Sequence, residues 1–279
     1  MADAAREQRP SRAIVVGAAV ALVLVGAIVA ALVPRSKPAA GFGATADDIA
    51  PTTAVVLYLR IDSFDATKGT LAARVRADPG PALAAQGARV AVGDGGRPEL
   101  IVAPGAPSAE QSLVLDVDRG SVSSYPFDRY DLEETVAAVP TGSIQIIGTT
   151  TAAGFSVSGT AGAGDGHDHV SLALEVERVR PQVVWAIGMM AIDWALAIAV
   201  VAVVVALALR QRPWETRHLA WLGSMIFALA AFRSTAPGNP PIGVFLDFAA
   251  FFWAEALIVA SLVTLVVLYL SRSRADLDL

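Results

Sequence analysis

The sequence contains no cysteine and very little lysine or histidine. The absence of cysteine excludes disulfide bonds, thiolate nucleophiles and Cys-ligated zinc. Arginine supplies 19 of the 21 basic residues, because only Lys37 and Lys68 are lysines. The three histidines lie in predicted loops without a Gly-x-Ser-x-Gly elbow, which argues against a hydrolase. His167 and His169 have alternate spacing, but no nearby residue completes a ligand set, so we predict neither a metal nor a cofactor.

The chain is acidic, with a net charge of −5. Residues 34–182 hold 18 Asp and Glu and 12 Lys and Arg, a difference of −6. Nucleic-acid binding and docking on anionic lipid both require a basic surface. The charge therefore argues against nucleic acid as a partner.

Long apolar runs supply most of the hydrophobicity, which reaches 54% with a mean hydropathy of +0.56. Soluble domains contain roughly 45–50% apolar residues, and a helix needs about 20 to cross a bilayer. We expect one N-terminal transmembrane helix, an extracytoplasmic antiparallel β-sandwich and three C-terminal transmembrane helices. The predicted segments are a cytoplasmic N-terminus (1–12), transmembrane helix 1 (13–33), the β-sandwich (34–182), transmembrane helix 2 (183–209), a cytoplasmic loop (210–218), transmembrane helix 3 (219–232), an outer turn (233–241), transmembrane helix 4 (242–270) and a cytoplasmic tail (271–279).

The first apolar run is longer than the core of a signal peptide, which has about 7–15 apolar residues. No clear cleavage site follows it directly, and 38–40 is the nearest candidate. We therefore favour a retained anchor and keep cleavage as the alternative.

The region between the first two apolar runs is rich in short strand-like segments. In the last of them, Leu172, Leu174 and Val176 alternate with polar or small residues, as in a strand with one buried face. The predicted strands are 55–61, 70–77, 88–92, 99–103, 112–117, 132–139, 143–149, 155–159 and 170–179. Turn residues between them favour a sandwich or an open barrel.

The arginines fix the expected orientation in a cell membrane. Eight of them lie in the N-terminus, the 210–218 loop and the C-terminal tail, and one lies at the 233–241 turn. The positive-inside rule then places both termini in the cytoplasm and the β domain outside.

Three acidic residues, Asp193, Asp247 and Glu255, fall inside apolar runs, where charges are costly. Arg233 ends the preceding helix, so we expect an Arg233–Asp247 ion pair that closes the outer turn. Asp193 and Glu255 lie at similar depths in their helices and are predicted to face each other. Interhelix hydrogen bonding is the structural interpretation, and a proton or cation path is the alternative.

The most distinctive exported motif is 125–130, in which three aromatic residues could anchor a loop on the sheet while Asp128 and Arg129 face polar partners. Pro126 excludes pairing within a central strand. We expect a structural corner, and alternatively a partner contact. The candidate contact residues are Tyr125, Phe127, Asp128, Arg129 and Tyr130.

The 125–130 motif and the stretch from 233 to 255 resemble an uncharacterised bacterial membrane-protein family, domain of unknown function 4436. The resemblance implies the same layout and no activity. A weaker similarity is to pentameric ligand-gated channels, whose extracellular domain has an aromatic-Pro-x-Asp loop like 125–128 and a basic-Pro junction like 178–181. This chain departs from them in its helix before the β domain, its three following helices and its lack of a polar pore helix.

These observations favour a non-enzymatic envelope scaffold or binding protein that acts through its exported β domain. Its expected partners are the lipid bilayer and either another envelope protein or further copies of itself. The alternative is a channel or transporter subunit that uses the intramembrane carboxylates. An enzyme acting on lipid or cell-wall precursors is a third hypothesis, which no motif supports.

Overall fold

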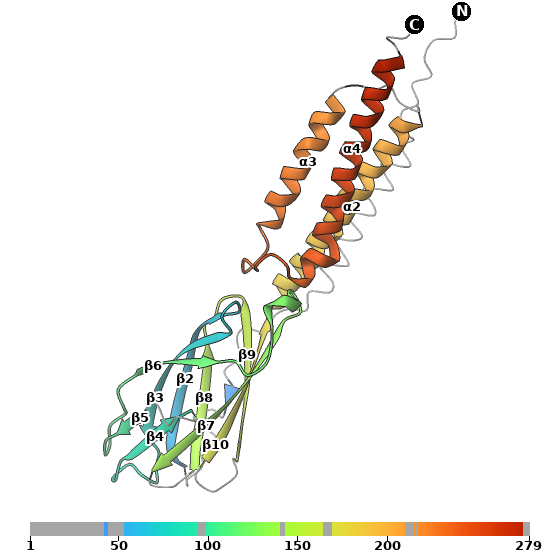
Figure 1. Cartoon of the computed structure of the whole chain (residues 1–279). Helices are drawn as coiled ribbons and strands as arrows, with labels where there is room; N and C mark the ends of the chain where they lie inside the picture. The colour runs from blue at the N-terminus through green and yellow to red at the C-terminus, as the bar shows by residue number, and fades with distance from the viewer. Residues whose placement is uncertain are drawn as a thin grey trace, which may run out of the picture.

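A β domain stands at one end of a long helical bundle in the computed structural model (Figure 1). The structure describes residues 42–43, 53–93, 99–139, 143–163, 169–209, 215 and 217–275. Helix 13–33 of the sequence prediction and the His167–Asp168 pair lie outside the described residues.

Nine of the ten strands coincide with the predicted segments, and β1 is an addition to them. They are β1 (Phe42–Gly43), β2 (Thr53–Asp65), β3 (Thr70–Pro79), β4 (Ala88–Val92), β5 (Glu99–Val102), β6 (Gln111–Asp116), β7 (Arg129–Val139), β8 (Ser143–Thr150), β9 (Phe155–Ala163) and β10 (His169–Arg178). All nine predicted segments form strands, and Leu172, Leu174 and Val176 face the core as expected.

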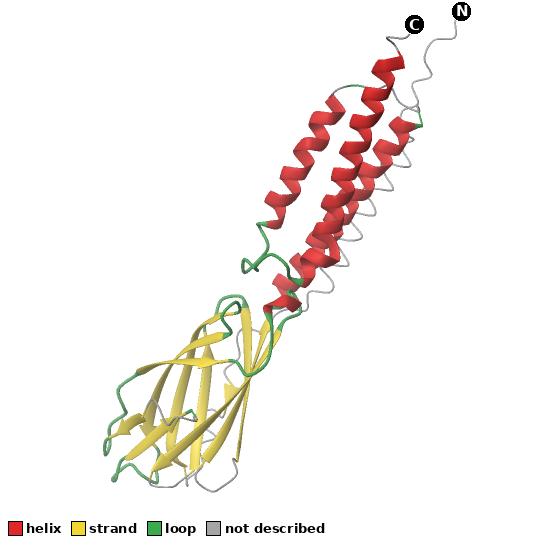
Figure 2. Cartoon of the chain, viewed as in Figure 1, coloured by secondary structure: helices red, strands yellow, loops and turns green. Residues whose placement is uncertain are grey.

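Two five-stranded sheets, β1-β8-β2-β3-β6 and β5-β4-β7-β10-β9, enclose the main hydrophobic core. Buried Leu57 and Val75 come from the first sheet, and Leu132 and Leu174 from the second. The two layers are visible in Figure 2.

The prediction of a wholly antiparallel sandwich is wrong at one pair, because β2 and β8 run parallel. Parallel neighbours need a long crossover, and strands β3 to β7 together form this connection.

The helices follow directly from β10. They are α2 (Arg180–Ala208), α3 (Arg217–Arg233), the π-helical turn η3 (Asp247–Phe251) and α4 (Phe252–Ala275). Two of the described helices, Arg180–Ala208 and Asp247–Ser271, are long and apolar enough to cross a membrane. α3 has 17 residues, or about 26 Å at 1.5 Å per residue.

The predicted start of the last helix at Ile242 is wrong, because Ile242 and Gly243 lie in a turn. The cause is Asp247, whose Oδ2 accepts hydrogen bonds from the backbone amides of Gly243 (2.7 Å) and Val244 (3.2 Å). Asp247 thus reaches back to amides that precede the helix, as the third helical residue of a capping box does.

Candidate functional site

The loop between β6 and β7 connects the β domain to the helices. It contains the short 3-10 helix η2 (Val122–Ser124) and a cis Tyr125–Pro126 peptide bond. Tyr125 is buried against Ala186 of α2 and against Val244 and Leu246 of the turn before η3. Its hydroxyl donates to the carbonyl oxygen of Pro237 at 3.0 Å. Burial raises the pKa of Tyr125 to about 12, so this hydroxyl keeps its proton at neutral pH.

A buried ion pair joins Asp128 and Arg178 next to Tyr125. Arg178 Nε donates to Asp128 Oδ1 at 2.6 Å, and the side chains are 2% and 0% exposed. The Tyr130 hydroxyl donates to Asp128 Oδ2 at 2.9 Å. Burial, followed by the hydrogen bond to Asp128, raises the pKa of Tyr130. Both carboxylate oxygens therefore have donors, which a buried charge requires.

Aromatic rings and a glycine complete the surroundings of Arg178. Its guanidinium lies 4.5 Å from the ring centroid of Tyr125 and 4.8 Å from that of Phe155, both within cation–π range. Gly238 approaches it so closely that a Cβ there would stand 2.7 Å from Arg178 Nη1. Arg178 is thus held by the β domain and by the 234–243 turn at once.

This geometry agrees with the structural corner expected at 125–130 and bears on the alternative of a partner contact. Tyr125, Asp128 and Tyr130 are buried inside the junction and are not available to another protein. Phe127 is 56% exposed, but its ring contacts that of Phe245 at a centroid distance of 5.9 Å. Arg129 is exposed and pairs with Glu175 and Glu177 on β10. The motif thus packs as a corner through its three buried residues, and a partner contact through Phe127 and Arg129 stays a prediction.

A second buried ion pair lies where the helices meet the turn. Arg233 Nε and Nη2 donate to Asp247 Oδ1 (2.5 Å) and Oδ2 (2.9 Å). Arg233 Nη2 also donates to the carbonyl oxygens of Pro240 (3.4 Å) and Pro241 (3.0 Å). The expected Arg233–Asp247 ion pair is therefore present, and it holds the proline-rich turn against the end of α3.

Asp193 lies beside this pair and does not meet Glu255. It is 2% exposed, and it interacts electrostatically with Arg233 and Asp247. Its neighbour Trp194 donates to the carbonyl oxygen of Ala249 at 3.1 Å. Glu255 is six residues beyond Ala249, which is about 9 Å along a helix. Asp193 therefore lies level with Asp247 and Ala249, and the predicted Asp193–Glu255 pairing is not found.

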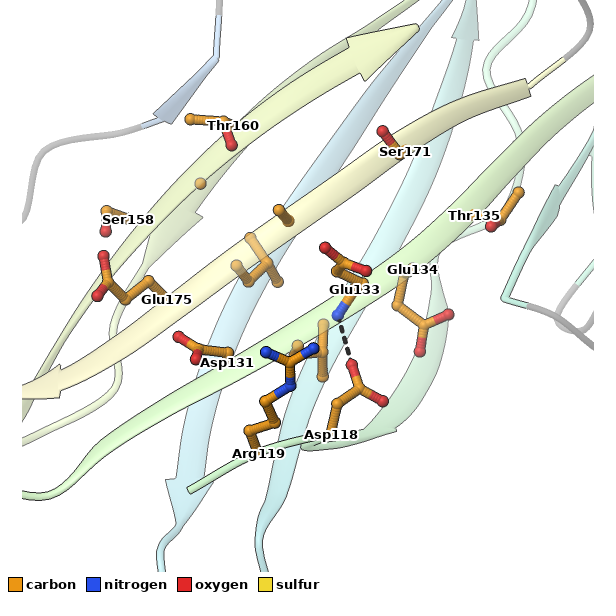
Figure 3. Close-up of a pocket in the computed structure, with 14 residues that line it drawn as sticks. Asp118, Arg119, Asp131, Glu133, Glu134, Thr135, Ser158, Thr160, Ser171 and Glu175 are labelled. Carbon is orange, nitrogen blue, oxygen red and sulfur yellow. Dashed lines mark hydrogen bonds between the residues drawn. The ribbon is translucent and has the colours of Figure 1, made fainter. Parts of the chain in front are cut away.

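Sequence reasoning missed an acidic groove on the outer face of the second sheet. Its cavity volume is about 780 Å3. Five carboxylates and one guanidinium line it, from Asp118, Asp131, Glu133, Glu134, Glu175 and Arg119. Small residues of β9 and β10, such as Ser158, Gly159 and Ala173, leave room above the sheet. Figure 3 shows Asp131 and Glu133 on β7 beside Glu175 on β10.

Two contacts fix the edge of the groove. Asp118 Oδ2 accepts the backbone amide of Glu133 at 2.7 Å, and Arg129 Nη1 pairs with Glu175 Oε1 at 2.9 Å. The outward positions of Asp131, Glu133 and Glu175 were readable from strand alternation. Their meeting depends on β7 pairing with β10, where Asp131 is opposite Glu175. No group of three or more possible metal ligands occurs within the described residues.

Comparison with known families divides the chain near the end of β10. Residues 45–177 match the family model of a domain of unknown function, DUF4436. We refer to this part of the chain as the DUF4436 domain, after the family model that it matches. Residues 178–272 match a second domain of unknown function, DUF8686. No curated protein matches the chain, and none of the matches supports the similarity to ligand-gated channels.

The two matched regions separate the candidate sites. The acidic groove lies wholly within the DUF4436 domain, and the Arg233–Asp247 pair lies within the DUF8686 region. The Asp128–Arg178 pair joins the two regions, because Asp128 belongs to the first and Arg178 to the second.

Proposed function

We propose that this chain is a multi-pass membrane protein that holds its DUF4436 domain outside the cell membrane as a binding module. The acidic groove carries the proposal, because it gathers five carboxylates around a cavity of about 780 Å3 on that domain. The ligand we propose is a basic segment of another envelope protein. The role is that of a non-enzymatic scaffold.

The helices support the membrane part of the proposal. α2 buries one face, which includes Ala186, Met189, Ala197 and Val200. Apolar side chains cover the outward face of the bundle as well. Exposed examples are Ile198, Phe227, Val263 and Val267. A bundle that is apolar on all sides requires a non-aqueous environment. With residues 13–33 and α3 as further spans, both termini lie on the same side of the membrane, and the distribution of arginines makes this side the cytoplasm.

The charge of the groove supports a basic ligand. A concave surface lined by charges of one sign concentrates the opposite charge near it. The groove is open along the outer face of β7, β10 and β9, which suits an extended segment. Electrostatic binding of this kind weakens as salt rises.

Binding to the groove can be measured by isothermal titration calorimetry of the full chain in mild detergent with a pentalysine peptide. We expect the double variant Asp131→Asn/Glu133→Gln to bind about tenfold more weakly, since each exposed charge contact contributes roughly 0.2–1 kcal/mol. Neither substitution changes the size of the side chain appreciably.

Glu110→Gln is the matched control. Glu110 is an exposed acid outside the groove, 3.8 Å from Arg74, and its replacement should leave the affinity unchanged. The proposal is wrong if the native protein does not bind pentalysine at low salt. It is also wrong if Glu110→Gln weakens binding as much as the groove variant, since the attraction would then reflect net charge alone.

A further inference from the structure

The end of the helical bundle nearest the β domain contains more buried negative than positive charge. Asp193 from α2, Asp247 from η3 and Arg233 from α3 lie together there. All three residues are buried. Two buried carboxylates therefore lie near a single guanidinium.

Arg233 already forms a two-point ion pair with Asp247. Its Nε and Nη2 atoms bind both oxygens of that carboxylate, and Nη2 also reaches two proline carbonyls. Asp247 Oδ2 receives two backbone amides in addition. This ion pair is satisfied without Asp193.

Asp193 Oδ1 is buried and has no hydrogen-bond partner within the described chain. A buried carboxylate without a partner is unfavourable. Trp194, fixed to Ala249, holds the adjacent position of α2 against η3 and so keeps Asp193 at the cluster. Glu255 of α4 is the next acid along the bundle, and Arg180 is the only other charged residue in α2.

We propose that Asp193 binds one monovalent cation, a proton or an alkali-metal ion, beside the Arg233–Asp247 pair. The bound charge balances the cluster, and Asp193 Oδ1 is the atom that receives it. This site is separate from the groove of the DUF4436 domain and does not depend on the function proposed for it.

The test uses the full chain in lipid nanodiscs. Thermal unfolding is measured while sodium or potassium chloride replaces choline chloride at constant ionic strength and pH. Infrared spectra of protein labelled with 13C at aspartate carboxyls are recorded in parallel. An alkali-metal site predicts a Tm that rises with the metal ion. If the site binds a proton, the Tm should not rise with the metal ion. The infrared spectrum should then contain the carbonyl band of a protonated aspartic acid.

In either case, Asp193→Asn should abolish the response, and Glu255→Gln, in the same bundle, should retain it. Asp193→Ser serves if the asparagine variant does not fold. A native protein that shows neither a metal-dependent Tm nor a protonated aspartate band overturns the proposal. Persistence of the response in a folded Asp193 variant overturns it equally.

Discussion

Replacing Asp128 by asparagine is expected to lower the free energy of unfolding of the DUF4436 domain by about 3–5 kcal/mol. The substitution leaves the Arg178 guanidinium, which is 2% exposed, without its counter-charge. Removing one partner of a buried ion pair is costly because the other remains buried and charged. The loss should lower the Tm of the domain by on the order of 10 °C.

Circular dichroism of the β-sheet signal can follow this unfolding. Tryptophan fluorescence reports on the rest of the chain separately, because the five tryptophans all lie between 185 and 253. Arg129→Gln is the matched control, since Arg129 is exposed and its pairs with Glu175 and Glu177 should contribute less than about 1 kcal/mol. Equal stability of Asp128→Asn and the native protein would show that the junction does not depend on this pair.

Asp247→Asn should produce a loss of similar size, about 3–5 kcal/mol, in the helical region. Arg233 would lose both charged contacts, and the backbone amides of Gly243 and Val244 would lose a carboxylate acceptor. We expect tryptophan fluorescence to report a lower Tm and limited proteolysis to cut the 234–243 turn faster.

Removing both charges separates the ion pair from a general packing defect. The double variant Arg233→Gln/Asp247→Asn should be more stable than Asp247→Asn alone, because it no longer buries the unpaired charge of Arg233. Glu255→Gln should behave like the native protein. A double variant that is less stable than Asp247→Asn would contradict this account of the turn.

Local patterns in the sequence predicted the elements of this fold well. Alternation of apolar side chains is a property of a single strand, so Leu172, Leu174 and Val176 could be assigned to the core without knowing their neighbours. Pro181 lies at the start of α2, where its missing amide costs nothing. The ends of the helices were predicted less accurately, because hydropathy locates the apolar run and not the helix itself. α2 begins at Arg180, three residues before its apolar run.

Features that depend on distant pairing could not be predicted in the same way. The parallel pairing of β2 with β8 and the meeting of Asp131 with Glu175 both require knowledge of strand order. The burial of Tyr125 and Asp128 depends on α2 and the 234–243 turn lying against their loop. The sequence of 125–130 alone shows aromatic and charged residues, which are as typical of an exposed binding surface as of a buried corner.

Cysteine labelling in intact cells tests the placement of the DUF4436 domain most directly. The native chain has no cysteine, so each introduced thiol is the only reactive one. Ser171→Cys places a thiol in the groove, and Gln211→Cys places one in the predicted cytoplasmic loop. A membrane-impermeant maleimide should label Ser171→Cys in intact cells and Gln211→Cys only after permeabilisation. The reverse pattern would contradict an external binding domain.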